Sequence, residues 1–194
     1  MLRELVMEGE TSRPFMRIFG STDLSRYAIY SPARTEFRDM SGRLIEAQDN
    51  PMAAIEGRET EPLFRALDRV LLYGALVWGA IVGPFVLELD GKSEEEPSPP
   101  SLSQFRRLRI ELARSLDPVA PVRRLSIDHL GLARRVDCEL RPFFCGPVVD
   151  TLSAYGVFDG IAVPTLHRFQ ALSSDRTIAP TPLIDIEIFD VQFL

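Results

Sequence analysis

Eighteen consecutive residues without a charged side chain, residues 70–87, constrain the fold of this chain more than any other feature. A spanning helix needs about 20 apolar residues to cross a hydrocarbon core of about 30 Å, so the run is just long enough to suggest one. Gly83 and Pro84 predict a turn near its end, which leaves about thirteen apolar residues, a length more typical of a buried core helix. We therefore expect a core helix followed by a strand at 85–89, with a membrane segment and an exposed apolar interface as alternatives.

The start of this helix is expected near Thr60, whose hydroxyl can cap the first turn, with Pro62 at a position where a missing N–H costs nothing. Upstream, short apolar runs predict strands at 15–19 and 27–30. A hairpin is expected next, with arms at 35–38 and 43–47. Its loop, 39–42, has Asp at the start and Gly at the end, as a turn built on type I prefers.

The second half of the chain predicts helices and strands in alternation. Residues 101–104 fit a capping box, and the spacing of the apolar residues that follow predicts a helix. Its inner stripe would be Phe105, Leu108, Leu112 and Leu116. A short helix is expected around 147–155, a strand at 161–163, and a terminal strand that alternates apolar and acidic residues from 184 to 188 and runs to residue 194.

These elements together predict an α+β fold. We expect a mixed, mostly antiparallel sheet packed against two to four helices, in a single domain over residues 1–194. Residues 92–100, rich in Glu, Pro and Ser, are expected to form an exposed acidic loop. An apolar share of 45% and a charged share of 26% are those of a globular chain.

The first residues interrupt their apolar side chains with charges, so secretion is not expected. Two cysteines do not make a disulfide framework, which favours a reducing compartment. The predicted location is intracellular, in the cytoplasm, or in a virion.

Arginine outnumbers lysine by twenty-one to one, and the single lysine is Lys92. A coding bias toward GC-rich codons explains this excess better than selection for guanidinium chemistry, because arginine is favoured at individual bidentate sites and not in bulk. The arginines nevertheless concentrate in residues 106–141, which predicts a binding surface for nucleic acid or another anionic partner. The alternative is a solvated helix face with internal pairs such as Arg107 with Glu111. The candidate binding residues are Arg106, Arg107, Arg109, Arg114, Arg123, Arg124, Arg134 and Arg135.

Charge is unevenly distributed along the chain. Residues 1–100 contain 17 acids and 11 bases, residues 101–141 contain five acids and nine arginines, and residues 142–194 contain six acids and two arginines. An acidic, basic and acidic order of this kind suits contact between the positive face of one copy and the negative face of another.

Catalytic motifs are weak. Glu88 and Asp90 flank Leu89 at the end of the expected strand, where two carboxylates could share a divalent cation for phosphoryl transfer. A hydrolase could use His129 or His167 as general base, oriented by Asp150 or Asp159, but no Gly-x-Ser-x-Gly motif is present. Cys138 and Cys145 have six residues between them, which does not fit a zinc knuckle. We expect no metal, and no P-loop or Gly-x-Gly-x-x-Gly motif announces a cofactor.

The leading hypothesis is therefore a non-enzymatic interaction or assembly protein that forms a homo-oligomer, such as a viral structural component or an accessory protein of a mobile element. The first alternative is a metal-dependent phosphoesterase or nuclease that uses Glu88 and Asp90. The second is a membrane-associated regulator anchored by residues 70–87, which is not favoured.

Overall fold

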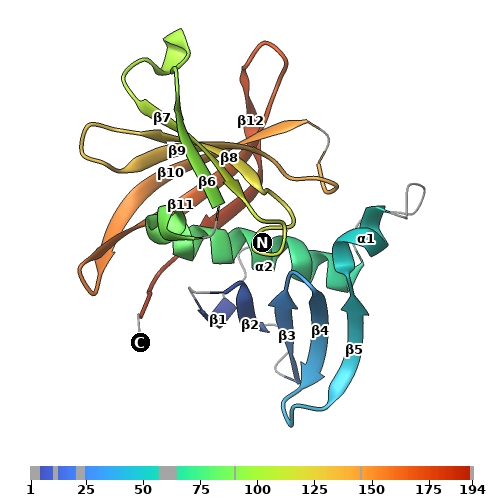
Figure 1. The fold of residues 1–194 in the computed structure, drawn as a ribbon. Coiled ribbons are helices and arrows are strands. Elements are labelled where there is room, and N and C mark those ends of the chain that lie inside the picture. The colour runs from blue at the N-terminus through green and yellow to red at the C-terminus, as the bar shows by residue number, and fades with distance from the viewer. Residues whose placement is uncertain are drawn as a thin grey trace. The chain divides into compact units, whose positions relative to one another are not determined.

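The computed structural model describes residues 5–10, 13–20, 25–56, 65–89, 91–144 and 146–192. Over these residues the chain is mostly β, with one five-stranded and one seven-stranded antiparallel sheet (Figure 1). Helix α2 (Ala66–Val82) is the one long α-helix of the described part, and α1 (Pro51–Glu56) is a short one. The predicted mixed sheet packed against two to four helices is therefore wrong, although the coarser expectation of strands combined with helix is confirmed.

The chain forms two compact units. The first contains residues 1–79 and 114–119, and the second contains residues 80–113 and 120–194. Helix α2 runs from the first unit into the second, so a single domain over residues 1–194 stays a prediction.

The five-stranded sheet of the first unit is a meander in which each strand pairs with the next along the chain. Its strands are β1 (Leu5–Glu10), β2 (Phe15–Gly20), β3 (Arg26–Ser31), β4 (Arg34–Asp39) and β5 (Leu44–Asp49). The predicted strands at 15–19 and 27–30 and the predicted hairpin are confirmed. Its loop is held by the Asp39 carboxylate, which accepts hydrogen bonds from the backbone N–H groups of Ser41 and Arg43, both at 2.9 Å.

Helix α2 confirms that a buried helix fills much of the apolar run. With its 3₁₀ extension it spans Ala66–Glu88, which is long and apolar enough to cross a membrane, yet 67% of its most apolar window is buried. In the first unit, Gly74 lies against the ring of Tyr30 on β3 so closely that an added Cβ would be 2.3 Å from Tyr30 Cγ. Glycine at this position therefore sets how near the helix lies to the sheet. The predicted start at Thr60 lies outside the described residues.

The seven-stranded sheet of the second unit is also a meander in chain order. Its strands are β6 (Gly91–Glu96), β7 (Arg106–Leu112), β8 (Val122–Ile127), β9 (Ala133–Glu139), β10 (Pro147–Phe158), β11 (Ile161–Leu172) and β12 (Ile178–Glu187). Two predicted helices are strands here: the capped helix is β7, and the segment at 147–155 is part of β10. Apolar residues at positions 108, 110 and 112 alternate with polar ones, and this period of two decides for a strand over the spacing that suggested a helix.

Three further expectations are corrected. The segment expected as a strand at 85–89 is the 3₁₀ helix η1 (Gly83–Glu88), whose Val86 packs with Ile110, Leu112 and Leu125. Residues 92–100 are largely exposed as expected, but β6 extends to Glu96 and the short 3₁₀ helix η2 (Pro100–Leu102) follows. The terminal strand ends at Glu187, before the final residue.

A buried carboxylate links two arginines on β4. Glu36 is buried and accepts hydrogen bonds from Arg34 Nε at 2.5 Å and from Arg38 Nε at 2.6 Å. The hydrogen bond from Arg38 lowers the pKa of the Glu36 carboxyl most, burial opposes the shift, and Arg34 lowers the pKa further. The ionised form of Glu36 is therefore favoured in the folded unit.

Replacing Gly74 with alanine should destabilise the first unit, because the new methyl group would overlap the Tyr30 ring. We expect Gly74→Ala to lower the free energy of unfolding by about 1–3 kcal/mol. Urea denaturation followed by the fluorescence of Trp78, the only tryptophan, measures this. Gly83→Ala is the matched control, since its Cβ would meet nothing within 4 Å. Equal stability of the two variants would contradict the close helix–sheet contact.

The lowered pKa of Glu36 predicts a specific pH dependence. Its stabilising contribution is complete above the ordinary glutamate value of 4.5 and is lost as the pH falls through the lower pKa of the folded state. Between neutral and acid pH, the unfolding free energy of Glu36→Gln should therefore change less than that of the wild type. Glu56→Gln, at an exposed carboxylate at the end of α1, should keep the wild-type profile. If the unfolding free energy of Glu36→Gln depended on pH as that of the wild type does, ionised Glu36 would not stabilise the folded unit.

Candidate functional site

A transverse row of polar residues crosses all seven strands of the second sheet. Residues directly opposite each other on antiparallel strands point to the same face. From β6 to β12 the row is Glu96, Arg107, Ser126, Arg135, Thr151, Arg168 and Asp185. The polar side chains of seven distant segments are therefore brought into register by strand pairing alone.

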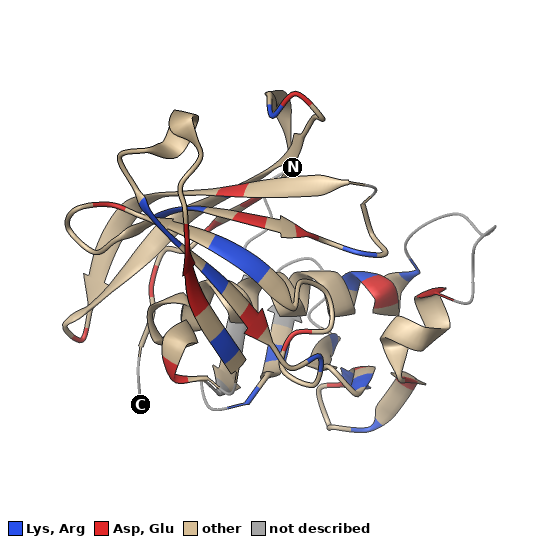
Figure 2. Ribbon diagram, turned by 45° about the horizontal axis from the view of Figure 1, so that its top comes forward, with Lys and Arg blue, Asp and Glu red and all other residues tan. Residues whose placement is uncertain are grey.

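A second row lies beside the first on the same face. Across β6 to β9 it contains Glu94, Arg109, Arg124 and Asp137. We call the residues of both rows on β6–β9 the charged face: Glu94, Glu96, Arg107, Arg109, Arg124, Ser126, Arg135 and Asp137. Figure 2 shows acidic and basic segments lying side by side on neighbouring strands. The opposite face of the same strands is apolar and contains Leu108, Ile110, Leu125 and Val136.

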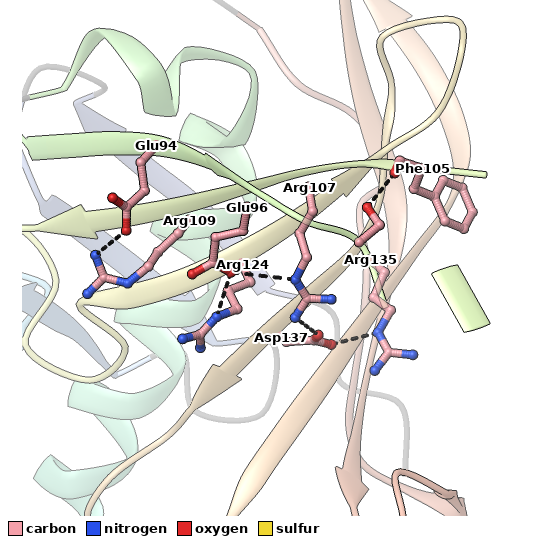
Figure 3. A network of polar contacts seen from close by, with 9 residues as sticks. Glu94, Glu96, Phe105, Arg107, Arg109, Arg124, Arg135 and Asp137 are labelled. Atoms are coloured by element: carbon pink, nitrogen blue, oxygen red, sulfur yellow. Dashed lines mark hydrogen bonds and ion pairs between the residues drawn. The ribbon is translucent and has the colours of Figure 1, made fainter. Parts of the chain in front are cut away.

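Arg107 is the centre of the charged face and is only 6% exposed. Its Nη2 donates a hydrogen bond to Asp137 Oδ2 at 2.7 Å, and its Nε lies 3.8 Å from Glu96 Oε2 (Figure 3). Asp137 also accepts a hydrogen bond from Arg135 Nε at 2.6 Å, and Glu96 accepts one from Arg124 Nε at 3.0 Å. Two carboxylates thus connect three arginines through three charge-assisted hydrogen bonds and the longer ion pair between Arg107 and Glu96.

Not every hydrogen-bond donor of Arg107 has a partner among the described residues. Its Nη1 and the hydroxyl of Ser126 are buried and have no hydrogen-bond partner in the part of the chain that the structure describes. The two residues lie directly opposite each other on β7 and β8. Because a buried guanidinium with an unsatisfied N–H is costly, the bonds from Arg107 to its carboxylates matter more than those of an exposed pair.

Pairs at the margin of the sheet are more exposed. Arg109 lies 3.2 Å from Glu94 and 2.8 Å from Glu111, and the hydrogen bond to Glu111 is the main reason why the pKa of Arg109 is raised. Arg106 is paired with Glu95 at 3.1 Å. Such pairs contribute little to stability because water screens them.

Seven of the eight predicted binding arginines belong to β7, β8 and β9, and not to the face of a helix. Arg123 Nε donates to the carbonyl of Ala120, and Arg134 Nε donates to Asp128 at 2.6 Å. Arg114 stands apart in the connection after β7. The predicted pair of Arg107 with Glu111 does not form, because residues four apart on a strand lie about 13 Å from each other, and Arg109 binds Glu111 instead. The arginines are indeed gathered, but with carboxylates among them, so an anionic partner through residues 106–141 stays a proposal.

Of the predicted metal pair, the structure describes Glu88 alone, so a cation site at Glu88 and Asp90 stays a prediction. Glu88 is exposed at the end of η1, and Asp90 lies outside the described residues. No group of three or more His, Cys, Asp or Glu side chains that could hold a metal occurs in the described part of the chain. Cys138 is buried, and Cys145 also lies outside the described residues.

The structure brings His167 and Asp150 together, one of the pairings that the sequence left open. Both are buried, and His167 Nδ1 lies 2.9 Å from Asp150 Oδ2. The other ring nitrogen, Nε2, lies 3.2 Å from the carbonyl oxygen of Pro164. In a hydrolase that nitrogen would face the nucleophile, so the pair has the geometry of a buried structural contact.

One exposed apolar cluster was missed from the sequence. Met40, Leu44 and Ile45, on the hairpin of β4 and β5, are 60%, 45% and 53% exposed. The signal was present, because adjacent apolar residues in a strand point to opposite faces and cannot both enter one core. Strand β5 is also an edge of the five-stranded sheet. We call these three residues the hairpin cluster.

The buried pairing of Arg107 predicts a large effect at Asp137. Asp137→Asn removes the charge that binds Arg107 and Arg135, and we expect a loss of about 3 kcal/mol in the free energy of unfolding. Asp185→Asn is the control, because its partner Arg168 is half-exposed and the change should be about 1 kcal/mol or less. Chemical denaturation of both variants checks the difference. Equal losses would mean that Arg107 does not depend on Asp137.

No protein-family model, curated protein or solved structure matches the chain. The function proposed below therefore rests on the residues and geometry of the chain itself.

Proposed function

We propose that this chain is a non-enzymatic interaction protein that self-associates through the hairpin cluster. The observation that carries the proposal is the exposure of Met40, Leu44 and Ile45 within six residues of one hairpin. Scattered exposed apolar residues are ordinary, but several together on one edge of a sheet favour a partner.

A second copy of the chain suits this surface by charge as well as by apolarity. Leu44, Ile45 and Glu46 are the first three residues of β5, and Arg43 directly precedes them. The two charged residues therefore flank the two apolar ones. When two such segments approach in antiparallel orientation, Arg43 of one copy faces Glu46 of the other, and Leu44 faces Ile45. A two-fold contact requires a self-complementary patch of this kind. The register shift between Phe37 and Arg38 leaves Ile45 without a Cα partner on β4, so Ile45 interrupts the regular alternation of faces along β5.

The charged face gives weaker support for assembly. The acidic residues of β6 and the arginines of β7 and β8 pair within one chain, so the uneven order of charges along the sequence is largely balanced inside the sheet. The apolar run is mostly buried, which gives the membrane alternative little support. Origin from a virus or a mobile element stays a prediction.

Ile45→Glu tests self-association most simply. Light scattering after size-exclusion chromatography should show a multimer for the wild type and a dissociation constant raised about tenfold or more for the variant, because a charge enters the apolar contact. Val157→Glu is the matched control, since Val157 is 73% exposed on a hairpin of the other sheet. The wild-type multimer should persist at high salt, as expected for apolar contact.

A wild-type chain that is monomeric at all salt concentrations would overturn the proposal. So would a multimer that dissociates with salt and is unaffected by Ile45→Glu, because assembly would then depend on charged surfaces.

A further inference from the structure

We propose that a pocket at one end of the seven-stranded sheet binds a small organic anion with an apolar body. The pocket has a volume of about 410 Å³ and is about half open to solvent. It is lined by Gln104, Arg106, Ile127, Asp128, His129 and Gly131. These residues come from the connection before β7, the start of β7, the end of β8 and the turn that follows it.

One wall of the pocket is a rigid turn. The Asp128 carboxylate accepts hydrogen bonds from the N–H groups of Leu130 at 2.9 Å and Leu132 at 3.0 Å, and from Arg134 Nε at 2.6 Å. Burial raises the pKa of Asp128, but the bonds from Arg134 and the two N–H groups outweigh it and lower the pKa overall. Asp128 therefore shapes the turn, and its charge is balanced by Arg134.

The other polar side chains of the pocket can all donate hydrogen bonds. Arg106 uses Nε and Nη2 on Glu95, at 3.3 and 3.1 Å, and its Nη1 has no partner in the described chain. His129 is exposed in the turn, and neither its ring nor the Gln104 amide has a hydrogen-bond partner among the described residues. A guanidinium, an imidazole and an amide around one pocket match a carboxylate, phosphate or sulfonate group.

We expect the ligand to have an apolar part because Ile127 also lines the pocket. Ile127 is partly buried and packs against the cluster of Val86, Ile110 and Leu125. A ligand with its anionic group near Arg106 would place its apolar body on this side. Glu95 competes with the ligand for Arg106, because both present an acceptor to the same guanidinium.

Fluorescence titration with 8-anilinonaphthalene-1-sulfonate, a sulfonate on an aromatic body, provides the first test. Arg106→Gln should weaken saturable binding about fivefold or more, as expected for loss of a charged hydrogen bond. Glu95→Gln should strengthen it, because the competing carboxylate is removed. Arg168→Gln is a matched control, since Arg168 binds Asp185 through the same two nitrogens and is also exposed. Its binding should equal that of the wild type.

Octanoate should then displace the dye more effectively than octanol, which has the same chain without the charge. Three results would overturn the proposal: no saturable binding, equal binding by Arg106→Gln and Arg168→Gln, or equal displacement by octanol and octanoate. Self-association is a separate property, since the hairpin cluster belongs to the other compact unit, and failure of either proposal leaves the other standing.

Discussion

The pairing of Arg107 with Asp137 is the interaction on which the charged face depends. Arg107 is buried on a strand whose alternate side chains form an apolar layer with Val86 and Leu125. A slip of one residue in β7 would bring Arg107 to that layer and expose Ile110, so the position of the guanidinium and the apolar pattern require the same register. Asp137 on β9 then links that strand to β7 across β8, because its carboxylate accepts a hydrogen bond from Arg107.

The sequence predicts the first half of the chain better than the second for a physical reason. The hairpin around residues 39–42 is decided by local turn chemistry, and α2 by a long apolar run with few alternatives. Strand β7 is different, because Leu108 and Leu112 fit a helix stripe and a strand face equally well. The capping pattern at 101–104 predicts a helix, whereas Ile110 fits only the strand face, and pairing with β6 and β8 forms that strand.

Strand β6 forms through partners that lie far from it along the chain. Its three consecutive glutamates resemble a solvated loop when read alone, and they become a strand because the arginines of β7 and β8 face them. Seven of the candidate arginines lie on three neighbouring strands, and their partners lie up to 30 residues away along the chain. Charge balance over such distances follows from strand order, which one sequence does not contain. This is why the arginines suggested an anionic partner while the structure shows internal ion pairs.

A double-mutant cycle between Arg107 and Asp137 tests the central claim most directly. In Arg107→Met with Asp137→Leu, both charges are replaced by apolar groups, so the double variant should be far more stable than the sum of the single losses predicts. We expect a coupling energy of about 2–3 kcal/mol between the two positions from chemical denaturation. Additive losses, with a coupling below about 0.5 kcal/mol, would contradict the view that this buried ion pair sets the register of the charged face.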